Sequence, residues 1–566
     1  MSEKTTHGVI KQASFLMIAT MICRVIGLLY RTPLHGIMGN VGDGYYSLAY
    51  DWYNIILLIS SYSIPMAVSK VMAELLASKE YRNAQKVFYA ALIYVLIVGG
   101  GGALAAFFGA PYLLSTQPEA VLALRVLAPT IMLSGFLGVL RGYFQARNTM
   151  VPTALSQIME QIVNAVISVV AAWAFTRRFI GSSEIEIGKY GAAGGTLGTG
   201  AGVLAGILVM LLVYIYNRKR VKKHLMHDRT EADKSYGEVF KMIFMMVSPV
   251  ILATCVYNVV GIVDQTLFTR LMPLTGASEV EISVQYALFG YQFKPIMNIP
   301  TALASATSTA LIPAIATAMA LGNKKDAGDK IRESVTFTMF LAIPCAVGMA
   351  VLSLPIIRIL YPSANENSAA LVLSVGAIAV IFYCLSTVTN GVLQGLGKPS
   401  LPVRNSAIAL VVNVLVQVFA TLVLKMGIFA LLLSSIMYAV TVSLLNYMSV
   451  KKLVDYKNDM KNAVVLPLSA AAVMAVVVGI LYWVPAFLLK DLMNRYIVNA
   501  IWSLLVVLIG VVTFILAYVK VSGKTVAELR RMPFGTRMLQ VMRLLRIKVP
   551  ETTVVTSDEN EADGTR

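Results

Sequence analysis

Three cations lie inside long apolar stretches of this chain, where charged side chains are costly. Arg24 and Arg31 fall within the apolar segment 13–34, and Lys294 falls within the apolar segment 284–320. At about 1.5 Å per helical residue, Arg24 would lie ~15 Å into its helix, near the middle of a ~30 Å hydrocarbon layer. A cation at that depth costs roughly 2.5–3.5 kcal/mol on insertion scales. We therefore expect Arg24 to face a watery or anion-holding cavity; the alternative is a structural ion pair with a buried carboxylate.

Acidic and amide side chains accompany these cations. Asp43 lies in a glycine-rich turn, and Asp51 follows at the membrane level of Arg31, which predicts an ion pair between Arg31 and Asp51. Lys294 begins a polar stripe that includes Asn298, on a segment interrupted by prolines, as expected of a helix that lines a cavity. The alternative for Lys294 is that its long side chain reaches out to the membrane surface.

A second polar stripe runs along the segment 152–175. Gln157, Glu160, Asn164 and Ser168 are spaced by three or four residues and so share one helical face. Such a stripe fits either helix–helix hydrogen bonds or a cavity wall, and an unpaired Glu160 at mid-depth favours a substrate or ion site.

Two further polar residues are candidate ligands for a monovalent cation. Asp264 and Asn413 lie within the apolar segments 242–270 and 402–424. We expect no bound cofactor, and transport coupled to sodium, to protons or to the membrane potential. The four cysteines are too scattered for a zinc site or for disulfides.

The composition indicates the environment in which this protein folds. The 566 residues are 57% hydrophobic and 13% charged, and the mean hydropathy is +0.73. Repeated apolar runs of this kind predict an all-α polytopic membrane protein. Fourteen spans are predicted, at residues 13–34, 45–69, 87–109, 120–141, 152–175, 192–216, 242–270, 284–320, 333–360, 368–394, 402–424, 427–450, 462–489 and 496–519.

The net charge of +18 reflects topology. Most of the 47 lysines and arginines fall in segments on the N-terminal side of the membrane, which predicts that both termini are cytoplasmic. We therefore expect membrane lipids as partners, no nucleic acid, and a monomer.

An internal repeat divides the chain. The motif at 142–145, followed by Pro152, recurs at 391–394, followed by Pro402, and Ile64-Pro65 recurs as Ile312-Pro313. The shared offset predicts two pseudo-symmetric six-helix bundles plus two C-terminal helices, an architecture typical of transporters. The expected parts are an N-terminal bundle (1–216), a basic cytoplasmic linker (217–241), a C-terminal bundle (242–450), two extra helices (451–519), and a basic amphipathic segment with a disordered acidic tail (520–566).

Six short motifs carry a resemblance to a known family, at residues 14–27, 42–45, 63–65, 142–152, 311–313 and 391–402. With these motifs in this order, the chain resembles the MurJ-type lipid II flippases and their stage V sporulation protein B-like relatives. These belong to the multidrug/oligosaccharidyl-lipid/polysaccharide exporter superfamily. The resemblance implies a cationic central cavity between two bundles, and a groove for a polyprenyl tail in the two extra helices.

The resemblance also implies roles for single residues. Arg24 matches the family's first span-1 arginine, Asp43 matches its outer acid, and Lys294 lies within a residue of its span-8 arginine. The second span-1 arginine of the family falls at Tyr30, next to Arg31, and its span-2 arginine has no counterpart here.

These observations predict a flippase of the bacterial cytoplasmic membrane. It would move a polyprenyl-pyrophosphate-linked sugar, with lipid II as the first candidate, from the inner to the outer leaflet by alternating access. The alternatives are another lipid-linked oligosaccharide and then a multidrug/cation antiporter, which would want an acidic cavity. A membrane glycosyltransferase would need an acidic or histidine centre at a membrane face, and a purely structural scaffold would leave Arg24 and Lys294 unexplained.

Overall fold

The computed structural model describes most of the chain, and almost all of what it describes is helical. The described residues are 16, 19–62, 64–226, 228, 230, 233–362, 365–454, 459–493, 495–531, 535–544 and 547. No β-strand occurs among them, which confirms the all-α prediction. The predicted acidic tail lies outside the described residues.

The chain forms two compact units. The first comprises residues 1–299, 357–372 and 398–445, and the second comprises 300–356, 373–397 and 446–566. The predicted division into an N-terminal and a C-terminal bundle remains a prediction.

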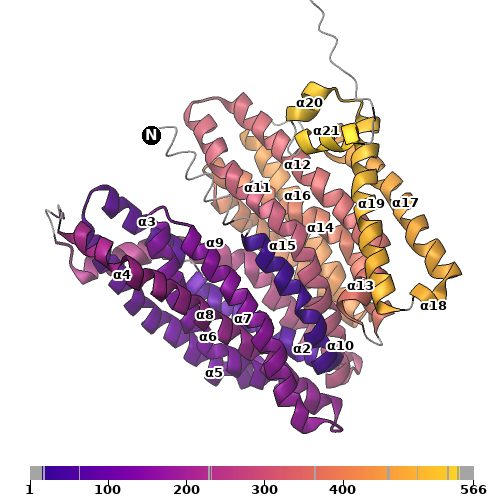
Figure 1. Cartoon of the computed structure of the whole chain (residues 1–566), viewed down its shortest axis with the longest axis horizontal. Coiled ribbons are helices and arrows are strands. Elements are labelled where there is room, and N and C mark those ends of the chain that lie inside the picture. The colour runs from indigo at the N-terminus through magenta and orange to yellow at the C-terminus, as the bar shows by residue number, and fades with distance from the viewer. Residues whose placement is uncertain are drawn as a thin grey trace, which may run out of the picture. The chain divides into compact units, whose positions relative to one another are not determined.

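The first unit is built on a long helical hairpin and the helices that follow it (Figure 1). Its helices are Ala19–Leu29, α2 (Arg31–Leu57), α3 (Ile64–Ala77), α4 (Tyr81–Tyr94), α5 (Gly100–Leu113), α6 (Val121–Gln145), α7 (Val151–Thr176), α8 (Glu184–Leu225), α9 (Tyr236–Leu271), α10 (Glu279–Ala287) and α15 (Ser400–Leu422). Short π-helical turns cover Leu58–Tyr62, Val95–Gly99 and Leu288–Phe293.

The second unit contains the C-terminal helices. Its own helices are α12 (Lys324–Val351), α17 (Leu466–Leu488), α18 (Lys490–Met493), α19 (Tyr496–Ser522), α20 (Val526–Arg531) and α21 (Gly535–Leu544). Helices α11 (Lys294–Ala320), α13 (Ser353–Leu360), α14 (Glu366–Gly395) and α16 (Ile428–Leu453) contribute residues to both units. Helices α17 and α19 run side by side (Figure 1).

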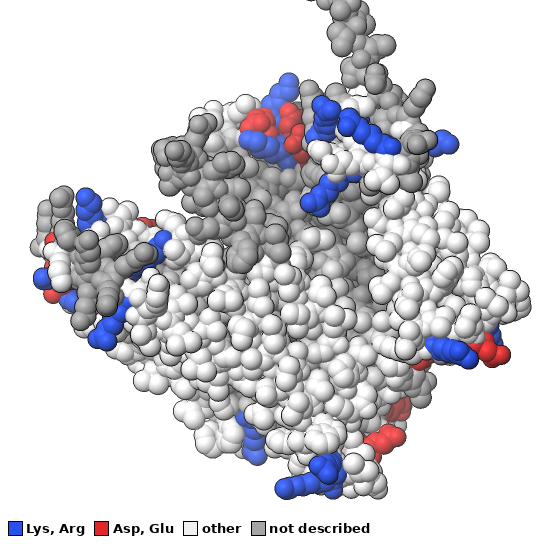
Figure 2. All heavy atoms as spheres, in the orientation of Figure 1, with Lys and Arg blue, Asp and Glu red and all other residues white. Residues whose placement is uncertain are grey.

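Twelve helical stretches are long and apolar enough to cross a membrane among the described residues. Two of the fourteen predicted spans lie where the description is incomplete: the first, helical over Ala19–Leu29, and the seventh, within α9. The polytopic membrane class is therefore confirmed, and the count of fourteen is not. On the face drawn in Figure 2, charged side chains lie near the ends of helices, for example at α18, α20 and α21, and the stretches between are uncharged.

Glycines let α7 and α8 pack closely. A Cβ on Gly198 would overlap Ser168, and one on Gly202 would lie 2.5 Å from the backbone oxygen of Glu160. These glycines allow the two backbones to approach, the usual role of small residues in membrane helices.

The internal repeat has a structural counterpart. A Cβ on Gly142 in α6 would lie 2.7 Å from the carbonyl oxygen of Pro65 in α3. In the second copy, a Cβ on Gly391 of α14, the counterpart of Gly142, would overlap Ser308 of α11, the helix that carries Ile312 and Pro313. In each copy, a glycine at the end of one helix thus packs against the helix that carries the Ile-Pro pair.

The C-terminal amphipathic helices pack within the second unit. Leu529, Met538, Leu539 and Met542 are buried in a cluster that includes Tyr518 of α19. The apolar side of this segment is therefore covered by protein.

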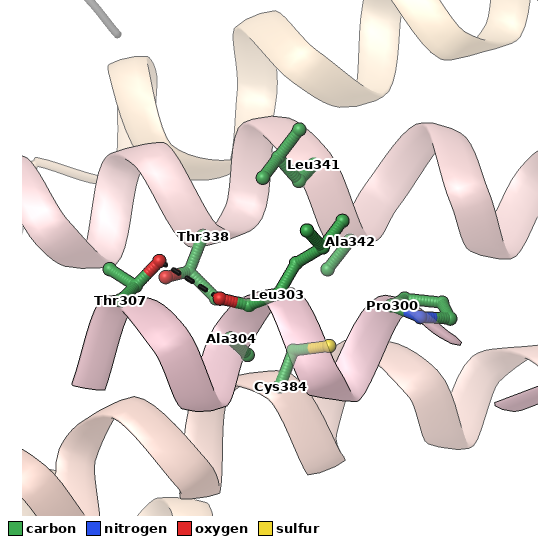
Figure 3. A pocket seen from close by; sticks show the side chains of 8 residues that line it. All are labelled: Pro300, Leu303, Ala304, Thr307, Thr338, Leu341, Ala342 and Cys384. Carbon is green, nitrogen blue, oxygen red and sulfur yellow. Dashed lines mark hydrogen bonds between the residues drawn. The ribbon is translucent and has the colours of Figure 1, made fainter. Parts of the chain in front are cut away.

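A small pocket lies between α11, α12 and α14 (Figure 3). It is lined by Pro300, Leu303, Ala304, Thr307, Thr338, Leu341, Ala342 and Cys384. The Thr307 hydroxyl donates to the carbonyl of Leu303 and the Thr338 hydroxyl to that of Ser334, so both spend their donors on their own helices. This leaves an apolar pocket without charged lining residues.

Candidate functional site

A single glycine turns the chain back on itself between the first two predicted spans. Gly39 has φ +67° and ψ −177°, a conformation that is essentially restricted to glycine. Residues on either side of it meet in pairs. The hydroxyls of Tyr30 and Tyr46 are 3.2 Å apart, and Nδ1 of His35 lies 2.6 Å from Oδ2 of Asp43. The predicted glycine-rich turn is therefore reduced to one residue.

Close packing fixes this hairpin against the helices that follow α9. A Cβ on Gly44 would overlap Ser283 of α10, whose hydroxyl donates a 3.0 Å hydrogen bond to the carbonyl of Val41. A Cβ on Gly290 would lie 2.9 Å from Cβ of Ser47. Glycine on each side thus brings α2 and the start of α11 within reach of each other's side chains.

Arg24 is an exposed cation that approaches α11. Its Nη1 donates a long hydrogen bond of 3.4 Å to the backbone carbonyl of Asn298. Within the part of the chain that the structure describes, no carboxylate lies within ion-pair distance of Arg24. The alternative of a structural ion pair is therefore not supported by the described residues.

Lys294, the first residue of α11, has a carboxylate partner. Its Nζ lies 2.9 Å from Oδ2 of Asp51 in α2, and the hydroxyl of Tyr286 donates to the same oxygen. The ammonium also lies 5.1 Å from the centre of the Phe289 ring. The predicted pair between Arg31 and Asp51 is wrong, because Asp51 faces α10 and α11 and takes Lys294 instead.

Arg31 is enclosed by tyrosines. Its Nη1 donates a 3.1 Å hydrogen bond to the carbonyl of Tyr291, and its guanidinium lies 4.7 Å from the ring centre of Tyr291 and 5.8 Å from that of Tyr46. The Tyr361 hydroxyl donates to the same carbonyl at 3.1 Å. Cation–π contacts of this kind stabilise a guanidinium away from water. Arg31 therefore holds the hairpin against Tyr291, whereas the side chain of Arg24 is exposed.

The structure thus brings four of the predicted residues together on one stretch of α11. Lys294 and Asn298 are one helical turn apart, about 6 Å along the axis. Asp51 contacts the first of them and Arg24 the second. Two cations from distant parts of the sequence therefore meet one turn of α11, and one of them is paired with a carboxylate.

The remaining predicted site residues lie elsewhere in the first unit. Glu160 is paired with Arg141 of α6, whose Nη2 lies 2.7 Å from Oε2, so the expectation of an unpaired Glu160 is wrong. The side-chain oxygen of Asn164 accepts a 3.0 Å hydrogen bond from Ser168, under the close contact with α8. Asn164 therefore serves helix packing, the other reading of its stripe.

The sequence reasoning did not find the partner of Asp43. Asp43 is 0% exposed and His35 is 2% exposed, and the His35 ring also makes an edge contact with Tyr361 at 5.9 Å. The pair was detectable, since a histidine and an aspartate flank Gly39 at equal spacing. Its burial makes Asp43 part of the hairpin rather than a wall open to ligand.

A second polar cluster lies between α9, α15 and α16. Oδ2 of Asp264 accepts a 3.0 Å hydrogen bond from Ser435, and Gln417 donates to the Asp264 backbone carbonyl at 2.9 Å. Asn413 lies beside the Asp264 carboxylate. The cluster is buried, with Asp264 3% exposed and both amides 0% exposed.

Several oxygens in this cluster have no hydrogen-bond partner. Among the described residues they are Oδ1 of Asp264, Oδ1 of Asn413 and Oε1 of Gln417, and the Nδ2 donor of Asn413 is likewise unpartnered. Buried polar atoms are usually satisfied, so the unpartnered oxygens of this carboxylate and of the two amides make the cluster a candidate cation site. One carboxylate with neutral oxygens around it suits a single positive charge.

Comparison with known proteins gives a consistent result. The family model described as "Lipid II flippase MurJ" matches residues 82–521. The lipid II flippase MurJ of Bacillus subtilis (strain 168) is 26% identical over 507 residues, covering 87% of this chain and 90% of that protein. The stage V sporulation protein B of the same organism is 24% identical over 458 residues, covering 80% and 85%.

A solved structure shares the fold. A lipid II flippase MurJ in an inward closed conformation superposes with a TM-score of 0.63 at 15% identity, covering 89% of this chain and 97% of that one.

Proposed function

Because the chain belongs to the lipid II flippase MurJ family, we propose that it carries lipid II from the inner to the outer leaflet of the bacterial cytoplasmic membrane by alternating access. The family places it among multi-pass transporters of lipid-linked precursors, not among enzymes. The observation that supports the choice of substrate is the meeting of Arg24 and Lys294 at one turn of α11.

A pyrophosphate fits this pair of cations. It carries several negative oxygens over two linked phosphates, and guanidinium and ammonium groups make strong charge-assisted hydrogen bonds to such oxygens. Crossing a hydrocarbon layer strips water from these oxygens, and Arg24 and Lys294 replace part of that water. The cost of keeping Arg24 at mid-depth is thereby offset when the headgroup is present.

The polyprenyl tail requires an apolar surface. The faces of α17 and α19 offer one, since Val476, Ile480, Leu504 and Leu508 are each more than half exposed. We assign this surface to the tail, which would stay in the bilayer while the headgroup crosses.

The buried cluster at Asp264 is suited to couple transport to a monovalent cation. Asp264 supplies the charge, and the unpartnered oxygens of Asn413 and Gln417 supply neutral ligands. A sodium ion or a proton would satisfy these atoms, and the membrane potential would drive either inward.

The decisive experiment is depletion of this protein in its native host. The expected result is accumulation of lipid II in the inner leaflet, measured by leaflet-specific labelling and mass spectrometry. Reintroducing the wild-type gene should clear the precursor, and Arg24→Ala should not. Normal distribution of lipid II after depletion would contradict the proposal.

Another lipid-linked oligosaccharide is the second candidate. Arg24 and Lys294 would contact the pyrophosphate, which does not distinguish one sugar from another. One of the matched relatives is the stage V sporulation protein B. Accumulation of a different lipid-linked saccharide in the same depletion would identify that substrate.

A further inference from the structure

Asp51 occupies the position that a phosphate oxygen would take at Lys294. One carboxylate oxygen receives both the Lys294 ammonium and the Tyr286 hydroxyl. A single anionic oxygen between an ammonium and a hydroxyl is the coordination expected for a phosphate oxygen in the same place. The carboxylate therefore mimics part of the headgroup.

The exposure of this pair suits an exchangeable contact. The side chains of Asp51 and Lys294 are each 22% exposed. A fully buried pair would be costly to open, because one charge would be left without a partner, whereas a fully exposed pair would hold Lys294 weakly. An intermediate position lets an incoming anion reach Lys294 while the pair still holds in its absence.

Arg24 and Lys294 differ in the groups that an incoming anion would have to displace. Among the described residues, Arg24 makes a long hydrogen bond to a backbone carbonyl, while Lys294 has a carboxylate, a hydroxyl beside it and an aromatic ring. An arriving pyrophosphate meets Arg24 with little to displace, and reaches Lys294 only by displacing a competitor of the same charge.

We infer that Asp51 is a built-in counter-ion of the substrate site, which holds Lys294 when the site is empty and competes with the pyrophosphate of a lipid-linked substrate for it. The inference rests on the proposed function, since it assumes that Lys294 binds that pyrophosphate. Its consequence is a site that binds less tightly than its cations allow and releases its ligand more readily, because Asp51 replaces the departing phosphate.

The test measures binding of undecaprenyl pyrophosphate to the full-length protein in lipid nanodiscs. Asp51→Asn keeps the shape of the side chain and removes its charge, so the affinity should rise by about tenfold, within the usual range of coupling between contacting groups. Lys294→Gln should weaken binding. The double variant should match Lys294→Gln, because Asp51 acts only through Lys294.

A matched control uses another ion pair of the same kind. Glu119 and Lys189 lie 2.7 Å apart with side chains 30% and 32% exposed. Glu119→Gln makes the same charge change away from α11, and its affinity should equal that of the wild type. A rise of equal size in Glu119→Gln would attribute the effect to net charge and overturn the inference.

A second variant addresses the folding of the first. Tyr286→Phe removes only the hydroxyl that holds the Asp51 oxygen, so it should raise the affinity in the same direction by a smaller factor. The inference is overturned if Lys294→Gln weakens binding while Asp51→Asn and Tyr286→Phe leave it unchanged or weaker, a result that spares the proposed function. If Lys294→Gln also leaves binding unchanged, the inference fails together with its premise.

Discussion

Two carboxylates in the first unit stand in opposite situations. Asp51 shares one oxygen between Lys294 and Tyr286 and is partly exposed, whereas Asp264 is buried with one oxygen unpartnered and two amide oxygens unpartnered beside it. The first carboxylate already has a cation from its own chain. The second has none within the described residues.

The difference indicates what each site can exchange. A carboxylate with a built-in cation can only lose it to a competing anion, which must be large enough to reach Lys294. A buried carboxylate with unsatisfied oxygens gains stability from a small cation that fits among them. The two sites therefore suit the two ligands proposed above, the pyrophosphate of the substrate and a monovalent cation.

The largest expected effect separates the two carboxylates. Sodium should raise the melting temperature of the purified wild type relative to potassium, by an amount equivalent to ~2.7 kcal/mol when sodium is about a hundredfold above its Kd. Asp264→Asn should abolish this stabilisation, while Asp51→Asn should keep it. An equal response to sodium in wild type and Asp264→Asn would place the coupling ion elsewhere or favour protons.

Removing the charge of Arg24 should impair transport of the anionic substrate and leave the response to sodium unchanged. Arg24→Ala loses charge-assisted hydrogen bonds worth roughly 1.5–3 kcal/mol each, so flipping in proteoliposomes should fall by about 10- to 100-fold. The variant should still insert and fold, since it removes an exposed cation from a span, and its response to sodium should be normal. Degradation of Arg24→Ala that is rescued by a new charge pair would instead show a structural role.

Substitutions of Lys294 test the same proposed anion-binding site. Lys294→Arg keeps a cation and adds a bidentate donor, so it should support growth of a strain that depends on this flippase. Lys294→Gln should fail. The losses from Arg24→Ala and Lys294→Gln should be less than additive because both residues hold one ligand. Normal growth of Lys294→Gln would mean that the cation is dispensable for transport and that Lys294 serves only as the partner of Asp51.

The smallest effect concerns the hairpin that carries Asp51. Gly39→Ala forces a side chain into a backbone conformation that costs about 1–3 kcal/mol, which should appear as a lower free energy of unfolding in detergent titrations. Gly36→Ala is the matched control: that glycine is helical with open space around it, so alanine should be neutral or slightly stabilising. Equal effects of both variants would show that the turn at Gly39 tolerates a side chain.

The sequence was sufficient for the fold class, and it singled out the two cations on which the proposed substrate site rests. Long apolar runs specify membrane helices whatever their partners, and Arg24 and Lys294 stand out because charges at that depth are costly.

The partners of charged residues could not be predicted in the same way. Lys294 and Asp51 are 243 positions apart, and their meeting depends on how α2 and α11 are rotated about their own axes. Helical periodicity gives the face of one helix but not the neighbour that the face will meet. Arg141 was overlooked for the same reason, although only 19 positions separate it from Glu160.

Because the chain reverses at a single residue, Gly39, no flexible loop separates the two helical segments of the hairpin. Hydrogen bonds continue through Tyr30, from Tyr30 N to the Ile26 oxygen and from Leu34 N to the Tyr30 oxygen, so the first leg is a continuous helix up to the region of Gly39. The legs are then clamped to each other at Tyr30–Tyr46 and His35–Asp43. These two contacts hold the helical segments of the hairpin in register, so Arg24 and Asp51 move together as parts of one rigid body. A movement of α11 that opened the Lys294 contact would therefore carry the start of α11 away from both residues together.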